Sequence, residues 1–130
     1  AYIRTTVAKG GADANNMWGA PGGKRWKAHD PALRLDALRG KAIFLSSGSG
    51  AIGPLDLTIK RDPKDGPEDA QIAAGSALEA ASYRCSLEFA ALLQSKNIPF
   101  TSGFRLIGTH SWTYWKQDLP KAWDAIAPAL

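Results

Sequence analysis

Two short apolar runs with a long helical segment between them limit what this chain can fold into. Residues 41–47 form a continuous apolar run that ends in Gly48-Ser49-Gly50, and residues 100–107 alternate enough to form a second strand. Between these runs, residues 70–96 repeat small and apolar side chains with the period of an amphipathic helix. A strand, a helix and a strand in this order predict a βαβ unit with parallel strands. We therefore expect an α/β fold.

Other segments carry weaker signals. Asp30 followed by proline predicts a short helix over residues 31–38, because the Asp side chain can cap the first turn and proline fits its first position. Residues 51–69, with three prolines and many charges, predict an exposed excursion. Residues 2–8 are compatible with the end of a helix or with a short extended piece.

Two helical segments have apolar side chains at three- and four-residue spacing. The final helix is expected over residues 111–127, and Pro120 should kink or restart it. On the helix at 70–96 the expected buried face consists of Ala77, Leu78, Ala81, Cys85, Phe89, Leu92 and Leu93. On the final helix it consists of Trp112, Trp115, Leu119, Trp123 and Ile126.

Composition excludes several classes of function. The net charge of +4 arises from 16 basic and 12 acidic side chains, and the bases are too scattered for a nucleic-acid patch. No run approaches the roughly 20 apolar residues of a membrane span. Cys85 is the only cysteine, so an internal disulfide or a zinc cluster cannot form. We expect Cys85 to be buried, or to pair with a cysteine elsewhere, and we expect no metal and no organic cofactor.

A histidine among aromatic residues directly follows the second expected strand, at the sheet edge where open α/β folds place their active sites. This residue, His110, has the side chain best suited to move protons near neutral pH. The aromatic rings beside it offer flat surfaces for a sugar or an acyl chain. Glu79 precedes it by 31 positions, which suits one helix plus one strand between the acid and the histidine of a serine triad.

Spacing alone leaves structural alternatives open for both residues. His110 could cap a helix whose tryptophans fill a core. Ser76 and Glu79 have the spacing of a capping box, in which Glu79 would only stabilise the start of a helix. Glu88 is a competing acid farther along the same helix.

Several motifs resemble those of one enzyme family, the mycolyltransferases of the antigen 85 complex and their esterase-like relatives. Thr109-His110-Ser111-Trp112-Thr113-Tyr114-Trp115 resembles the histidine motif of that family. The other matching segments, in chain order, are Asn16-Met17-Trp18-Gly19, Trp26-Lys27, Asp30-Pro31, the strand at 42–47 with its Gly-rich end, and Ala77-Leu78-Glu79. The resemblance extends over nearly the whole chain.

The resemblance implies an α/β-hydrolase with a Ser-Glu-His triad. In such a protein Glu79 would be the triad acid, His110 the base, and Trp112 a residue lining the sugar-binding part of the cleft. These enzymes transfer mycolyl groups between trehalose esters, or onto cell-wall sugar, outside the cell membrane. The resemblance therefore also implies a trehalose mycolate or a similar acyl-sugar substrate and a secreted or cell-wall-associated protein.

The chain also departs from this family. The family's Gly-x-Ser nucleophile motif and its oxyanion donors are not recognised in the sequence, and Ser47 stands where the family often has cysteine. We therefore expect residues 1–130 to be the C-terminal part of a single α/β-hydrolase domain, incomplete without the N-terminal half of the same protein, whether on this or a separate chain. The alternative is a non-catalytic relative that binds carbohydrate or matrix proteins through the same cleft.

Overall fold

The computed structural model describes Ala8 and residues 10–130. Of the segment 2–8, all but Ala8 lies outside the described residues, so its two interpretations stay open. The chain divides into two compact units, Ala1–Arg39 and Gly40–Leu130. The residues expected to form the site all belong to the second unit.

The described part of the first unit consists of short helical segments. These are α2 (Asn15–Trp18), α3 (Lys24–His29) and two 3-10 turns, η1 (Pro31–Leu33) and η2 (Leu35–Leu38). The helix expected over residues 31–38 is thus a pair of 3-10 turns. Its predicted cap is confirmed, because the Asp30 side chain accepts a hydrogen bond of 2.9 Å from the backbone N–H of Ala32. The Trp18 and Trp26 rings pack edge to face with centroids 5.0 Å apart.

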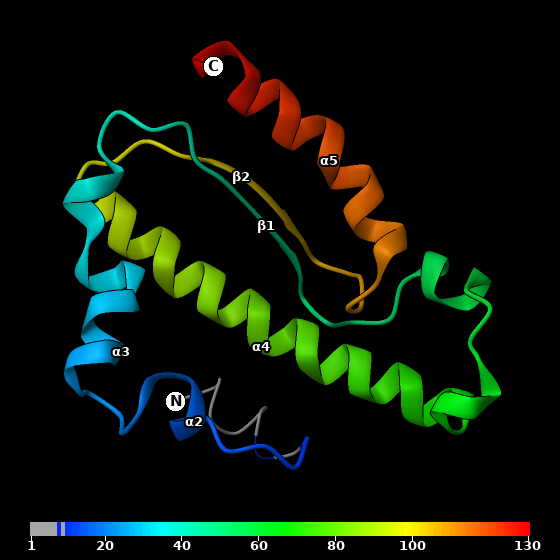
Figure 1. The fold of residues 1–130 in the computed structure, drawn as a ribbon. Coiled ribbons are helices and arrows are strands. Elements are labelled where there is room, and N and C mark those ends of the chain that lie inside the picture. Colours follow the sequence, from blue (N-terminus) through cyan, green and yellow to red (C-terminus); the bar gives the residue numbers. More distant parts are fainter. Residues whose placement is uncertain (1–7, 9) are drawn as a thin grey trace. The chain divides into compact units, whose positions relative to one another are not determined.

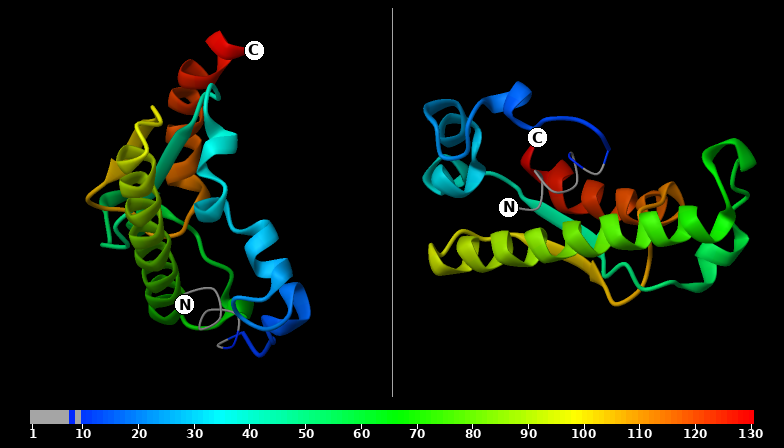
Figure 2. Two further views of the ribbon diagram at one scale, coloured as in Figure 1. Left: turned by 90° about the vertical axis from the view of Figure 1, so that its left-hand side faces the viewer. Right: turned by 90° about the horizontal axis from the view of Figure 1, so that it is seen from below.

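The second unit contains the predicted βαβ arrangement (Figure 1). Its main elements are β1 (Phe44–Gly48), α4 (Glu68–Ser95), β2 (Thr101–Arg105) and α5 (Trp112–Ile126). The two strands pair in parallel, in a register that runs from Phe44 opposite Thr101 to Gly48 opposite Arg105. The views in Figures 1 and 2 agree that this strand pair lies between α4 and α5. The predicted parallel strands and crossover helix are therefore confirmed.

The face of α4 that packs inward matches the expected one only in part: Leu93 is buried, whereas Ala77, Cys85 and Leu92 are exposed. Its buried residues are Glu79, Ala90 and Leu93, and the Tyr83 ring packs edge to face against Phe104 of β2 at 5.8 Å. Cys85 is exposed, so its expected burial is wrong. A charged side chain thus occupies the inner face of this helix, and apolar periodicity could not place it there.

On α5, too, the buried residues differ from the expected ones. Its buried residues are Tyr114 and Asp118, whereas Trp112, Leu119 and Trp123 of the expected inner face are exposed. The helix runs on to Ile126, so it does not restart at Pro120. Polar side chains on the inner face find partners inside the unit, as described below.

The backbones of the two strands approach each other closely at their carboxyl ends. A Cβ atom on Gly48 would lie 2.6 Å from the carbonyl oxygen of Gly108 and 2.8 Å from that of Ile107. Gly108 itself has φ of +110°, a conformation that side chains strongly disfavour. Its N–H donates to the carbonyl of Ala51 at 2.7 Å, and its carbonyl accepts from Gly50 at 3.0 Å. His110 follows this close approach by two residues.

Candidate functional site

Glu79 is held in place by groups from the end of β1. Its side chain is 2% exposed, and its Oε1 accepts hydrogen bonds from the Gly48 N–H at 2.7 Å and the Ser47 hydroxyl at 3.1 Å. Its second oxygen, Oε2, lies 2.8 Å from Nδ1 of His110. A carboxylate is stable at such depth only with partners of this kind. The structure thus brings together the two residues selected from the sequence.

The structural alternatives for Glu79 do not hold. Ser76 lies inside α4, and its hydroxyl donates to the carbonyl of Gly50, so it does not cap the helix and Glu79 is not its capping-box partner. Glu88, the competing acid, pairs with Arg84 at 3.4 Å on the exposed side of the helix. Of these two acids, Glu79 is the one that lies beside the histidine.

His110 follows β2 in a turn, and its side chain is 36% exposed. Its ring packs edge to face against Trp115 with centroids 4.6 Å apart, and Trp115 packs in the same way against Trp112 at 5.0 Å. The backbone N–H of His110 donates to the carbonyl of Gly75 in α4 at 3.2 Å. Within the described residues, Nδ1 is the only ring nitrogen with a hydrogen-bond partner. The other nitrogen, Nε2, is therefore available to a reacting group.

A cavity of about 530 Å³ lies beside this ring. Its lining includes His110, Trp112 and Trp115 together with Lys60 and Asp62 of the charged excursion. Trp112 is 72% exposed, so its ring face is accessible. Aromatic faces combined with charged and amide groups suit a ligand that has both apolar faces and hydroxyls.

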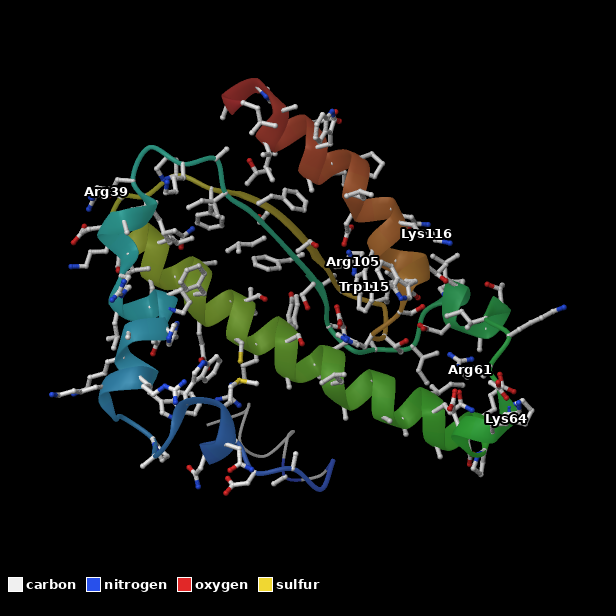
Figure 3. All side chains as sticks on the ribbon, in the orientation of Figure 1. Arg39, Arg61, Lys64, Arg105, Trp115 and Lys116 are labelled. Atoms are coloured by element: carbon white, nitrogen blue, oxygen red, sulfur yellow. The ribbon has the colours of Figure 1, made fainter. Side chains whose placement is uncertain are left out.

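Arg105, at the end of β2, adds a positive charge behind Glu79. It forms an ion pair with the buried Asp118 of α5, and its Nη2 lies 3.9 Å from Oε1 of Glu79. Its guanidinium also lies 5.3 Å from the centre of the Tyr114 ring. In the view of Figure 3, Arg105 and Trp115 are both labelled near the first turn of α5. Arg105 therefore links the acid to the helix that follows the histidine.

Sequence reasoning missed a second buried carboxylate, Asp56. It is fully buried within η3 (Pro54–Thr58) and accepts hydrogen bonds from the Gly53 N–H and the Tyr114 hydroxyl, each at 2.8 Å, and from the Thr109 hydroxyl. Burial alone raises the pKa of Asp56, but these hydrogen bonds outweigh it and hold the pKa below the usual value. An acidic residue three positions after Gly53 has capping spacing, the one sequence signal that could have indicated it.

The pKa of Tyr114, which donates a hydrogen bond to Asp56, is shifted in the opposite direction. Burial, the hydrogen bond to Asp56 and the negative charge of Asp56 raise the pKa of Tyr114 to about 12. Tyr114 therefore stays a neutral donor to Asp56 throughout the physiological range.

Two kinds of feature are absent from the part of the chain that the structure describes. No group of three His, Cys, Asp or Glu side chains in residues 8 and 10–130 is arranged to hold a metal ion. Among the same residues, no helix has the length and apolar character needed to cross a membrane.

Comparison with known proteins gives consistent matches. The family model Esterase, described as "Putative esterase", matches residues 2–126. The diacylglycerol acyltransferase/mycolyltransferase Ag85C of Mycobacterium avium is 31% identical over 115 residues, which cover 85% of this chain and 28% of that protein. The protein of the same name from Mycobacterium leprae is 30% identical over 112 residues, which cover 85% of this chain and 30% of that protein. The chain thus spans less than a third of these relatives, and its match over residues 2–126 shows that it belongs to the esterase family.

Proposed function

We propose that this chain supplies the acid and the base of a Ser-Glu-His triad that catalyses acyl transfer and ester hydrolysis. The observation that carries the proposal is the 2.8 Å contact between Oε2 of the buried Glu79 and Nδ1 of His110. It leaves Nε2 of His110 for a serine hydroxyl, and this arrangement of acid, imidazole and free nitrogen is the basis of triad chemistry. The serine and the oxyanion donors belong to an N-terminal half of the same α/β-hydrolase domain, outside these 130 residues.

In this mechanism His110 moves one proton in each direction. Nε2 takes the proton of the serine hydroxyl as the serine oxygen attacks the ester carbonyl. The resulting imidazolium then gives that proton to the departing alkoxide, which leaves an acyl-enzyme. A second hydroxyl, deprotonated by His110, attacks the acyl group, and His110 returns this proton to the serine oxygen as the bond between that oxygen and the acyl group breaks. The acceptor is a sugar hydroxyl in transfer and water in hydrolysis, and no metal or organic cofactor takes part.

Glu79 has two tasks in this scheme. It accepts a hydrogen bond from the Nδ1–H of His110, which fixes the tautomer with a free Nε2, and its charge stabilises the imidazolium. The donors on its Oε1, Gly48 N–H and the Ser47 hydroxyl, keep the carboxylate facing the ring. The pair is therefore oriented before any substrate binds.

For the substrate we propose a long-chain acyl ester of a sugar, such as a trehalose mycolate. The names of the two relatives describe acyl and mycolyl transfer. The cavity beside His110 presents Trp112 and Trp115, whose rings can stack on a sugar, as well as charged side chains that can bind hydroxyls. A secreted or cell-wall location is part of this proposal, because such acceptors lie there.

The test uses the complete protein that contains this chain, with p-nitrophenyl butyrate and trehalose monomycolate as substrates. His110→Ala should lower kcat by about 10²–10⁴-fold, the usual contribution of a positioned base. His29→Ala is the matched control, because His29 is the other histidine of the chain and belongs to the first unit. Full activity of His110→Ala on both substrates would refute the assignment. Loss of sugar binding in Trp112→Ala, in a protein with no esterase activity, would favour the non-catalytic relative.

A further inference from the structure

Residues on both sides of His110 donate hydrogen bonds to one buried carboxylate, that of Asp56. Asp56 accepts from the Thr109 hydroxyl through Oδ1, and from the Tyr114 hydroxyl at 2.8 Å through Oδ2. Thr109 directly precedes His110, and Tyr114 lies on the first turn of α5, four residues after it. Asp56 itself lies 53 residues before Thr109 in the sequence. One side chain thus joins η3 to two positions, five residues apart, on either side of His110.

Hydrogen bonds with residues close to it in the sequence also hold Asp56 in place. Its Oδ2 also accepts from the Gly53 N–H at 2.8 Å, and its carbonyl accepts from Arg61 Nη1 at 3.0 Å. Thr109 and Tyr114 are both buried, so these hydrogen bonds are shielded from competing water. Charge-assisted bonds of this kind are stronger and more directional than neutral ones.

The same turn is held by backbone contacts that do not determine the direction of the histidine ring. Gly108 forms backbone hydrogen bonds with Ala51 and Gly50, and the N–H of His110 donates to the carbonyl of Gly75. These bonds place the turn against β1 and α4. Besides the packing of the His110 ring on Trp115, the hydroxyls of Thr109 and Tyr114 relate the turn to α5, because both donate to Asp56.

We propose that Asp56 is a positioning residue, whose carboxylate holds Thr109 and Tyr114 and so orients the turn that presents His110 to Glu79. Its importance for reaction rate rests on the proposed function, but its effect on the His110–Glu79 contact does not. Asp56 does not line the cavity beside His110. It acts through Thr109 and Tyr114, and no contact between Asp56 and the substrate is required.

Three variants remove parts of this arrangement. Asp56→Asn removes the charge and presents an amide N–H₂ to neighbouring donors. Thr109→Val keeps the shape of the side chain and removes its hydroxyl, and Tyr114→Phe removes only the hydroxyl of the tyrosine. Thr109→Ser, the conservative variant, keeps the hydroxyl donor that Thr109→Val lacks. Matched controls are Thr58→Val, on the exposed part of η3, and Tyr83→Phe, whose ring packs on Phe104.

The first measurement is the NMR signal of the Nδ1 proton of His110 in the complete protein with nitrogen-labelled histidine, assigned by its loss in His110→Gln. Wild type and Thr109→Ser should show this proton shifted downfield and protected from exchange, as a hydrogen bond to Glu79 requires. Asp56→Asn, Thr109→Val and Tyr114→Phe should lose the protection, whereas Thr58→Val and Tyr83→Phe should keep it. An unchanged signal in all folded members of the first set would overturn the proposal.

The second measurement is kcat and KM for p-nitrophenyl butyrate. A displaced base should lower kcat by about 10–100-fold and leave KM nearly unchanged, because small misplacements of a reacting group have effects of this size. A lower melting temperature with both kcat and the His110 signal unchanged would mean a purely structural role and overturn the proposal. If the wild type proves inactive, the proposed function fails, and the NMR comparison still decides whether Asp56 positions His110. Should Asp56→Asn not fold, Thr109→Val and Tyr114→Phe decide.

Discussion

The hydroxyl of Ser47 donates to Oε1 of Glu79 at 3.1 Å, so the end of β1 holds the acid on the neighbouring helix. The backbone N–H of the next residue, Gly48, donates to the same oxygen at 2.7 Å. Strand and helix are therefore joined at the point where the acid meets His110. This arrangement leads to the first prediction.

Ser47→Ala should destabilise the protein by about 1–3 kcal/mol, because it removes one donor from a buried carboxylate. The Gly48 N–H still binds Oε1, so we expect the fold to persist. Ser47→Cys, with a weaker donor of similar shape, should lie between Ala and wild type. Urea unfolding of the three proteins measures the differences. Equal stability of the alanine variant and wild type would show that the hydroxyl contributes nothing to holding Glu79.

Glu79→Gln should lower kcat for ester hydrolysis by about 10³-fold or more while KM changes little. The amide can still accept from Gly48 through its oxygen, but its N–H₂ group then faces His110 and favours the tautomer with a proton on Nε2. That tautomer cannot take a proton from serine. Glu88→Gln makes the same substitution on the exposed side of α4 and should leave kcat unchanged. Similar activity of both variants would remove Glu79 from the reaction.

The stability of the protein should fall steeply in alkali because of Tyr114. Its pKa is raised from 10.0 to about 12 in the folded state, so the neutral tyrosine favours folding. This contribution is complete below pH 10 and is lost as the pH rises toward 12, and its size is roughly 2–3 kcal/mol. Measurements of unfolding free energy from pH 8 to 12 should therefore show a smaller alkaline loss for Tyr114→Phe than for wild type. Parallel curves would contradict the buried Tyr114–Asp56 hydrogen bond.

Two glycine-to-alanine substitutions should change the stability of the protein in opposite directions. Gly48→Ala places a Cβ within 2.6 Å of the Gly108 carbonyl oxygen, so the backbone must move, at a cost of about 1–3 kcal/mol or more. In α4, a Cβ on Gly75 meets Thr109 no closer than 3.7 Å, an ordinary contact. Gly75→Ala should instead stabilise the helix by about 0.5–1 kcal/mol. Thermal unfolding compares them, and a stable Gly48→Ala protein would show that the strand ends do not need this close approach.

Local sequence patterns were sufficient to predict the βαβ arrangement. Apolar runs indicated both strands, and helical periodicity indicated α4 between them, because these signals depend on neighbouring residues only. The order of elements also selected Glu79 and His110 as a pair. The place of His110 was predictable because open α/β sheets have their active sites at the carboxyl ends of the strands.

The inner faces of the helices could not be predicted in the same way. On α4 alanines and other small residues occur on several faces of the helix, so periodicity does not determine which of them faces the strands. On α5 the buried residues are Tyr114 and Asp118, whose polar atoms are compensated by Asp56 and Arg105. Such compensation depends on contacts across distant parts of the chain, and those contacts become visible only in the structure.

The position of Glu79 on α4 also fixes its distance, along the helix axis, from two residues that line the cavity. Gln71 and Gly75 line the cavity, and Glu79 follows at the same four-residue interval on the same face of α4. With a rise of 1.5 Å per residue, Gly75 lies about 6 Å and Gln71 about 12 Å from Glu79 along the helix axis. A bound molecule that extends along α4 from Gly75 therefore reaches Gln71 after about 6 Å, at the end of the cavity farther from Glu79. Substitutions at Gln71 should thus alter selection of the remote end of the substrate without changing the reacting end.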